Sequence, residues 1–165
     1  MAKTERTPEE SATISSHLIL PPDTNTLGTL FGGRIMEWMD ITAAIAAGRH
    51  VGGLVVTVSV DSIHFAKPIR LGDVATLKAC VNYAGRSSLE VGVRVEKEDA
   101  HNEHRVHCLT GYFTFVGVDN QGKPTAIPAL RPVTPREQLR YERAIERRAL
   151  RLKQSVRLSD DESPA

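Results

Sequence analysis

The segment from Phe31 to Gly48 constrains the fold most, because its pattern is helical and it is apolar on nearly every side. One group of apolar residues recurs at three- and four-residue steps, and a second group fills much of the remaining circumference. The first group is Ile35, Met36, Met39, Ala43, Ala46 and Ala47, and the second is Trp38, Ile41, Ala44 and Ile45. A helix that is apolar nearly all round has to be buried. We therefore predict one central helix, ended by Gly48 or by the Gly52-Gly53 pair.

The remaining body alternates with a period of two, which indicates strands. The expected strands cover residues 12–20, 54–60, 75–83, 88–96 and 104–118, with hairpin turns at 84–86 and 100–103. The alternation slips by one residue near Asp61-Ser62, which predicts a β-bulge there. Because no second βαβ unit is present, we expect an α+β fold: a curved antiparallel sheet wrapped around the central helix.

A separate charged helix is expected at 135–157. Thr134 and Glu137 form a capping box, with Pro135 at the first helical position. Residues 136–157 contain eight basic and three acidic residues, and a sparse apolar stripe of Leu139, Tyr141, Ile145, Ala149, Leu152 and Val156. We expect this helix to pack along the body or against a neighbouring subunit. A nucleic-acid arm is disfavoured, because the positive charge is local and no aromatic stacking residues accompany it.

These elements divide the chain into a disordered N-terminus at 1–11, a folded body at 12–130, and a C-terminal helix with an acidic tail at 131–165. The 165 residues carry a net charge of only +1, so composition gives no indication of nucleic acid or membrane as a partner. No apolar run is long enough to span a bilayer, and the charged start does not resemble a signal peptide. Cys80 and Cys108 lie in apolar runs, which suits reduced thiols in a cytoplasmic protein.

Asp40 is the most informative candidate residue, because it lies in the middle of the apolar helix. A carboxylate in such a helix is costly unless it is hydrogen-bonded or used in a site. The alternative is an Asp that caps a group or pairs with a basic residue.

Two features near the start of the same helix suit carbonyl chemistry. Gly32 and Gly33 would let a ligand approach the free N–H groups there, and such a terminus can stabilise an oxyanion. The amide of Asn25, in the preceding loop, can orient a water or donate to an oxyanion. The alternatives are a tight turn for the glycines and an Asx-turn for Asn25.

Other site motifs fail. His101, His104 and His107 imitate a metal cluster, but His104 and His107 point to opposite faces of the expected strand, so we expect no metal site. Ser87 and Ser88 have no adjacent base in the sequence, so a serine nucleophile is unsupported. No nucleotide-binding glycine motif and no hydrolase elbow is present.

Taken in order, these motifs resemble the hotdog-fold acyl-CoA thioesterase family, in its YciA-type and brain acyl-CoA hydrolase-like branch. The resemblance rests on Asp23-Thr24-Asn25, Gly28-x-Leu30-Phe31-Gly32-Gly33 and Met39-Asp40. It continues through Val58-x-Val60-Asp61-x-x-x-Phe65-x-x-Pro68-x-x-x-Gly72-Asp73 and Gly85-Arg86-Ser87-Ser88. It covers about residues 10–118 and identifies the body at 12–130 as a hotdog domain.

The resemblance implies a hydrolase that cleaves acyl-CoA to free acid and CoA without a cofactor. It also implies a role in fatty acid and lipid metabolism. It assigns catalysis to Asp40, as general base or nucleophile, and to Asn25 from the facing protomer. The amide of Gly33 or Gly32 would polarise the thioester carbonyl, and Arg86, Ser87 and Ser88 would lie near the CoA phosphates. It also implies a dimer of hotdogs, with three dimers in a homohexamer.

Two competing functions remain. The first is a non-enzymatic acyl-CoA sensor on the same fold, which would not need a carboxylate beside an oxyanion site. The second is a hotdog hydratase or dehydratase, which would place a histidine beside an acid; His64 is the only strand histidine near the expected bulge.

Overall fold

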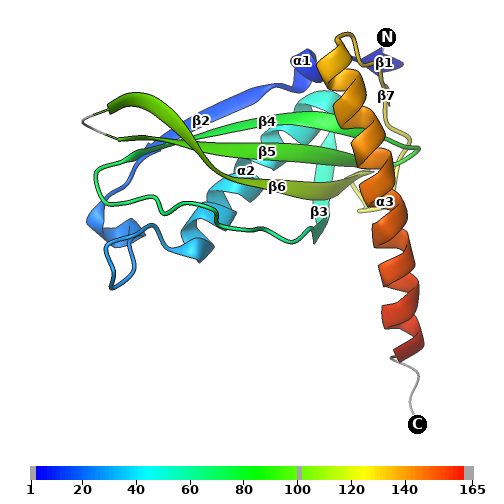
Figure 1. Cartoon of the computed structure of the whole chain (residues 1–165). Coiled ribbons are helices and arrows are strands. Elements are labelled where there is room, and N and C mark those ends of the chain that lie inside the picture. Colours follow the sequence, from blue (N-terminus) through cyan, green and yellow to red (C-terminus); the bar gives the residue numbers. More distant parts are fainter. Residues whose placement is uncertain (1–2, 100–101, 162–165) are drawn as a thin grey trace.

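The structure, a computed structural model, describes residues 3–99 and 102–161. It confirms the predicted α+β architecture, in which an antiparallel sheet of five strands curls around one long helix (Figure 1). The strand order is β2-β4-β5-β6-β3. In chain order the elements are β1 (Glu5–Arg6), α1 (Pro8–Ser11), β2 (Thr13–Leu18), the 3₁₀ turn η1 (Pro21–Asp23), α2 (Gly32–Val51), β3 (Leu54–Val60), β4 (Val74–Ala84), β5 (Ser88–Asp99), β6 (Asn102–Val118), β7 (Ala129–Leu130) and α3 (Pro135–Asp161).

The core lies between α2 and the concave face of the sheet. From α2 it takes Ile35, Met39, Ala43, Ala46 and Ala47, and from the strands it takes Ala75, Leu77, Ala79, Val81, Leu89, Val91, Val93, Val95, Phe113 and Phe115. Contact is close at Gly111, where a Cβ atom would lie 2.7 Å from Cε of Met39. The helix ends as predicted, with Gly52 in the left-handed conformation at φ 70°.

One side of α2 is not covered, so the helix is less buried than its composition predicts. Met36, Ile41 and Ile45 are each 44–51% exposed. Next to them β3 forms an edge of the sheet, and its even-numbered residues Leu54, Val56, Val58 and Val60 are 45–55% exposed. Among the described residues no further strand pairs with β3 on this side, so this edge of the sheet stays uncovered.

The predicted β-bulge lies earlier than expected. The register of β3 against β6 shifts between Thr57 and Ser59, not near Asp61-Ser62. The apolar alternation in the sequence changes phase only after β3, because the next apolar side chain that packs against the core is that of Ile63. The predicted turn at 84–86 is confirmed, since β4 and β5 form a hairpin there; the turn at 100–103 falls partly on residues outside the described ranges.

The N-terminal segment is ordered where it is described, although composition predicts disorder for residues 1–11. β1 pairs in parallel with β7, and Ser11 at the end of α1 is fully buried. The Ser11 hydroxyl accepts a hydrogen bond from the backbone N–H of Val81 at 3.0 Å. This tertiary contact fixes a segment whose own composition is polar; residues 1 and 2 lie outside the described ranges.

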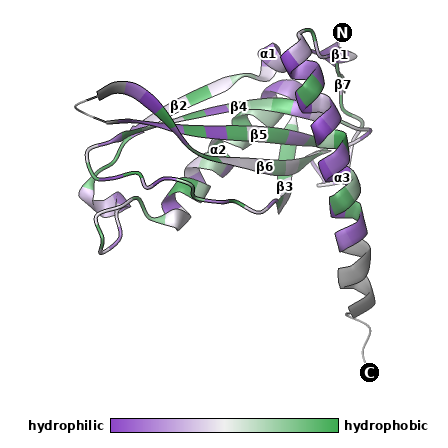
Figure 2. Ribbon diagram, in the orientation of Figure 1, coloured by the Kyte–Doolittle hydropathy of each residue, from purple (hydrophilic) through white to green (hydrophobic). Residues whose placement is uncertain are grey.

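Helix α3 crosses the convex face of the sheet, opposite α2 (Figure 1). Its capping box is confirmed: Glu137 accepts from the Thr134 N–H at 2.8 Å, and Thr134 Oγ1 accepts from the Glu137 N–H at 3.3 Å. The helix extends beyond the predicted end at 157 to Asp161, and residues 162–165 lie outside the described ranges. Hydrophilic and hydrophobic bands alternate along it (Figure 2).

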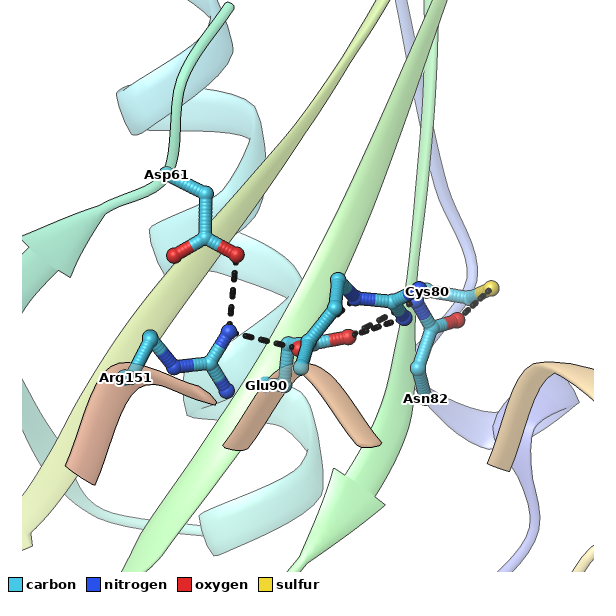
Figure 3. A network of polar contacts seen from close by, with 6 residues as sticks. Asp61, Cys80, Asn82, Glu90 and Arg151 are labelled. Atoms are coloured by element: carbon cyan, nitrogen blue, oxygen red, sulfur yellow. Dashed lines mark hydrogen bonds and ion pairs between the residues drawn. The ribbon is translucent and has the colours of Figure 1, made fainter. Parts of the chain in front are cut away.

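Charged and apolar side chains together hold α3 on the sheet: Tyr141 packs against the core and Ala144 is fully buried. Glu90 of β5 is 1% exposed and accepts from Arg147 Nη2 at 2.7 Å and from Arg151 Nη1 at 2.9 Å. Arg151 also donates to Asp61 at 2.8 Å, so one guanidinium bridges two carboxylates (Figure 3). By contrast, Leu139, Ile145 and Leu152 of the apolar stripe are 45–52% exposed.

Candidate active site

The loop before α2 is organised by Asn25. Its Oδ1 accepts from the backbone N–H groups of Leu27 at 2.9 Å and Thr29 at 3.2 Å, and its Nδ2 donates to Thr29 Oγ1 at 2.9 Å. These bonds are the Asx-turn that sequence propensity favours for this residue. The side chain is nevertheless exposed, so the loop presents it on the surface of the chain.

The first turn of α2 leaves backbone donors free. Phe31 is the N-cap and provides no side-chain cap. Among the described residues, the N–H groups of Gly32 and Gly33 donate to no acceptor. Free N–H groups at a helix start carry partial positive charge and attract an oxyanion. The ring of Phe31 lies against this turn, since a Cβ atom on Gly33 would lie 2.6 Å from Phe31 Cε1.

An apolar cavity of about 380 Å³ borders the same helix start. Its walls combine the first turn of α2 with the long connection between β3 and β4 and with β6: Thr29, Leu30, Gly32, Ile35, Phe65, Lys67, Pro68, Ile69 and Leu109. A free backbone donor therefore lies at the border of a space that suits a hydrocarbon group.

Asp40 lies further along α2, at the open side of the helix. It is half-buried, not enclosed as the apolar pattern predicts, because this side of α2 meets only the edge strand β3. Its Oδ1 accepts from the hydroxyl of Thr57 at 2.9 Å. The hydroxyl fixes one carboxylate oxygen, so the other oxygen is available to a water or a ligand.

Sequence reasoning missed Thr57. Its signal was weak but present: Thr57 and Ser59 are the two polar residues in the otherwise apolar segment 54–60. The structure brings Thr57 and Asp40 together, and among the described residues no hydrogen bond joins Asp40 to Asn25.

Arg86, Ser87 and Ser88 form the turn between β4 and β5 and the start of β5. Arg86 is exposed, and Ser88 lines a cavity of about 320 Å³ that also has Tyr83, Arg148 and Arg151 in its walls. Leu89, next to Ser88, pairs with Phe115, which pairs in turn with Thr57. The turn therefore lies two strands away from Thr57 across the sheet, with its cavity on the side that carries α3.

No further site for chemistry emerges from the described part of the chain. It contains no group of three His, Cys, Asp or Glu side chains that could hold a metal ion. Cys108 is buried and Cys80 is partly buried, and both are free thiols. Burial raises the pKa of each thiol. Within the same described ranges, no helix is long and apolar enough to cross a membrane.

The sequence of this chain is similar to those of known proteins. Residues 27–103 match a family model of the Thioesterase superfamily. The chain is 39% identical over 139 residues to the uncharacterized acyl-CoA thioester hydrolase YkhA of Bacillus subtilis, a match that covers 84% of this chain and 81% of that protein.

Solved structures of acyl-CoA hydrolases have a similar fold. An acyl-CoA hydrolase from Staphylococcus aureus, determined with butyryl-CoA, CoA and CoA disulfide, superposes with a TM-score of 0.87 at 38% identity and covers 94% of this chain and 97% of its own. A hexameric acyl-CoA thioesterase without ligand gives a TM-score of 0.89 at 39% identity, covering 92% of this chain and 97% of its own. Variants of the Staphylococcus aureus enzyme with an aspartate, an asparagine or a threonine replaced by alanine have also been solved. The chain therefore belongs to the hotdog-fold family of acyl-CoA thioester hydrolases.

Proposed function

We propose that the chain hydrolyses acyl-CoA to a free carboxylic acid and CoA. The observation that carries this proposal is the Asp40 carboxylate, held by the Thr57 hydroxyl at an open side of α2 whose first turn has free N–H groups beside an apolar cavity. A thioester is already activated, so its hydrolysis needs a placed water or nucleophile and a donor for the oxyanion.

In the reaction, the N–H of Gly33 or Gly32 polarises the thioester carbonyl. Asp40 acts either as general base on a water or as a nucleophile that forms an anhydride. As a base, Asp40 takes a proton from the water whose oxygen bonds to the carbonyl carbon; the C–S bond breaks, and the CoA thiolate takes up that proton. As a nucleophile, Asp40 bonds to the carbonyl carbon and the C–S bond breaks, which leaves the anhydride and the CoA thiolate. Water then hydrolyses the anhydride, which releases the free acid, restores the Asp40 carboxylate and supplies the proton that the thiolate takes up. The cavity at Leu30, Ile35 and Leu109 offers room for apolar substrate atoms next to the carbonyl.

The relatives support these roles through spacing. In the Staphylococcus aureus enzyme, the replaced asparagine, aspartate and threonine are separated by the same numbers of positions as Asn25, Asp40 and Thr57. The three residues therefore correspond to residues that were singled out in a protein described as an acyl-CoA hydrolase.

We further propose that Asn25 acts from the facing protomer of a dimer. The edge strand β3 leaves its backbone groups and its apolar side chains uncovered, as α2 leaves Met36, Ile41 and Ile45. A second copy that covers this edge would place its exposed Asn25 loop against Asp40. Three such dimers would form a homohexamer, as hexameric relatives suggest.

Arg86, Ser87 and Ser88 are proposed to bind the CoA phosphates. Arg86 is exposed at a turn, and Ser88 shares a cavity with Arg148, so donors for a phosphate lie on the turn and beside it.

The first experiment measures free thiol released from acyl-CoA. Asp40→Asn keeps the shape of the side chain but removes the base or nucleophile, so turnover should be abolished while the fold is retained. The matched control is Glu37→Gln, an acid on the same helix whose side chain is 53% exposed and which pairs with Arg34. A well-folded Asp40→Asn protein with normal hydrolysis would contradict the assignment, and acyl-CoA binding without any thiol release by the native protein would favour the sensor.

The second experiment tests the shared site. Inactive Asn25→Ala and Asp40→Ala chains are mixed in equal amounts under conditions that let subunits exchange. About half of the dimers are then mixed, and one of their two sites has both residues, so activity should return to roughly a quarter of the native value. Exchange is confirmed with mass-tagged subunits. If exchange is complete and no activity returns, both residues act within one chain.

A further inference from the structure

The apolar cavity beside the start of α2 is graded from an exposed rim to a buried floor. At the rim, Phe65 and Lys67 of the connection between β3 and β4 are exposed. At the floor, Ile35, Ile69 and Leu109 are only 1–4% exposed. These three side chains come from α2, from the same connection and from β6, so they close the cavity from different directions. A chain that enters at the rim therefore meets a closed end.

The floor of this cavity is part of the packed interior. Ile35 and Leu109 belong to the core between α2 and the sheet. Ile69 is fixed through its backbone, because its carbonyl oxygen accepts from the N–H of Leu30 at 2.7 Å. Protein interiors are close-packed and yield little to an oversized group. The floor therefore limits how far a ligand reaches.

The lining of the cavity suits a hydrocarbon chain. Its polar side chains are those of Thr29 and Lys67. Lys67 is exposed, so its ammonium group stays in water while its aliphatic stem borders the cavity. The cavity at Ser88, by contrast, has Glu90 and Arg148 in its walls, and hydrocarbon over such groups would cost them their hydration. Of these two cavities, the one at the start of α2 fits an acyl chain.

The ring of Phe65 connects the cavity with the proposed oxyanion donor. A Cβ atom on Gly32 would lie 3.7 Å from Phe65 Cζ, so the ring reaches the first turn of α2. Gly32 and Phe65 both line the cavity. An acyl chain whose carbonyl is held at the Gly32 N–H therefore begins beside this ring. Phe65 is 53% exposed in the single chain, and the chain would remove part of that apolar surface from water.

The volume gives a scale for the acyl group. An apolar protein cavity of about 150 Å³ holds benzene, which is roughly 25 Å³ for each carbon atom. On this scale the cavity of about 380 Å³ would hold at most about fifteen carbons, and its open rim takes part of that space.

We propose that Ile35, Ile69 and Leu109 set the length of the acyl group that the protein accepts, with a limit at about twelve carbons. The substrate class is then short- and medium-chain acyl-CoA. This inference rests on the proposed function, since it assigns the cavity to the acyl group of that reaction.

Binding of S-alkyl-CoA thioethers tests the cavity without turnover, because a thioether has no carbonyl to hydrolyse. The full chain is titrated calorimetrically with S-butyl-, S-octyl-, S-dodecyl- and S-hexadecyl-CoA, each below its micellar concentration. Affinity should rise about fourfold for each methylene that enters the cavity. It should stop rising, or fall, between S-dodecyl- and S-hexadecyl-CoA.

Variants of the floor should move this limit. Leu109→Ala should extend it by about three carbons, the number that the substitution removes from the floor. Ile35→Phe fills part of the cavity and should shorten the limit. The matched control is Leu77→Ala, which removes the same atoms from a fully buried core side chain outside the lining and should leave the limit unchanged. Should Leu109→Ala not fold, the smaller change Leu109→Val should move the limit in the same direction.

Thiol release from acyl-CoA substrates of the same lengths separates this inference from the proposed function. The value of kcat/KM should be at least about tenfold lower for palmitoyl-CoA than for octanoyl-CoA. If no acyl-CoA releases thiol, hydrolysis is refuted, while a thioether limit that moves with Leu109 still supports the role of the floor. If affinity rises evenly through S-hexadecyl-CoA, or if the Leu109 variants keep the limit of the native chain, the inference is overturned while hydrolysis stands.

Discussion

Replacement of Glu90 by glutamine tests whether a buried ion pair fastens α3 to the sheet. Glu90 is 1% exposed, and the side chains of its partners Arg147 and Arg151 keep only 21% and 17% of their surface in water. Removing one member of a buried pair costs about 3–5 kcal/mol, because the remaining charge is left without a partner. Arg151 keeps Asp61, and both arginines are partly hydrated, so we expect the lower end, about 3 kcal/mol of the free energy of unfolding.

The assay is urea unfolding at a fixed protein concentration, followed by the fluorescence of Trp38, the only tryptophan. The matched control is Glu5→Gln, whose salt bridge with Arg131 has both side chains more than half exposed, at 56% and 57%. Such a surface pair contributes about 0–1 kcal/mol. The reasoning would be refuted if Glu90→Gln and Glu5→Gln lowered the unfolding free energy equally. A double-mutant cycle with Arg147→Gln then measures the coupling between Glu90 and Arg147 directly.

Three further predictions concern the candidate site and the core. Thr57→Val removes the hydroxyl that donates to Asp40, so kcat should fall by roughly tenfold or more, as for a hydrogen bond to a charged group, with little change in KM; an unchanged kcat would argue against a positioning role. Arg86→Ala should raise KM more than it lowers kcat, because a phosphate contact is equal in the ground and transition states; steady-state kinetics showing the reverse would exclude that role. Burial lowers the pKa of His50 below its ordinary 6.5, and its Nδ1 has no hydrogen-bond partner among the described residues. As the pH falls, His50 is therefore protonated in the unfolded chain before it is protonated in the folded chain. The contribution of His50 to the unfolding free energy should be constant above about pH 6.5 and should fall as the pH drops below that value. The urea midpoint at pH 7 and pH 5.5 checks this, and His50→Gln should show a smaller loss than the native chain.

The central helix and the individual strands were predictable because each depends on a local period. The period of α2 follows from spacings within one turn, and Gly52 marks its end by its left-handed conformation. The strands alternate with a period of two, and the pairing of β4 with β5 follows from a short hairpin. The pairings of β2 with β4 and of β3 with β6 join segments far apart in the sequence, and no local pattern predicts them. The division of the chain at 12–130 and 131–165 stays a prediction.

Contacts between residues on different strands and helices were not predictable from these local periods. The bulge at Thr57 and Ser59 is a feature of pairing between β3 and β6, which the alternation within one strand does not contain. For the same reason the sequence did not indicate that Thr57 meets Asp40, since the two side chains come from different elements. The polar composition of residues 1–11 suggested disorder. The structure has α1 there instead, because a contact with β4 buries Ser11.

Helix α3 separates most clearly what the sequence determined by itself from what only the tertiary structure decided. Its start at the Thr134 capping box, its helical period and its charge are local properties, and they were evident from the sequence. Which side meets the sheet was decided by residues far from it in sequence: Glu90 and Asp61 attract Arg147 and Arg151, and Tyr83 contacts Tyr141. Because the buried carboxylate of Glu90 needs a partner, Arg147 and Arg151 face inward together with Tyr141 and Ala144, and Leu139, Ile145 and Leu152 remain about half-exposed in the single chain.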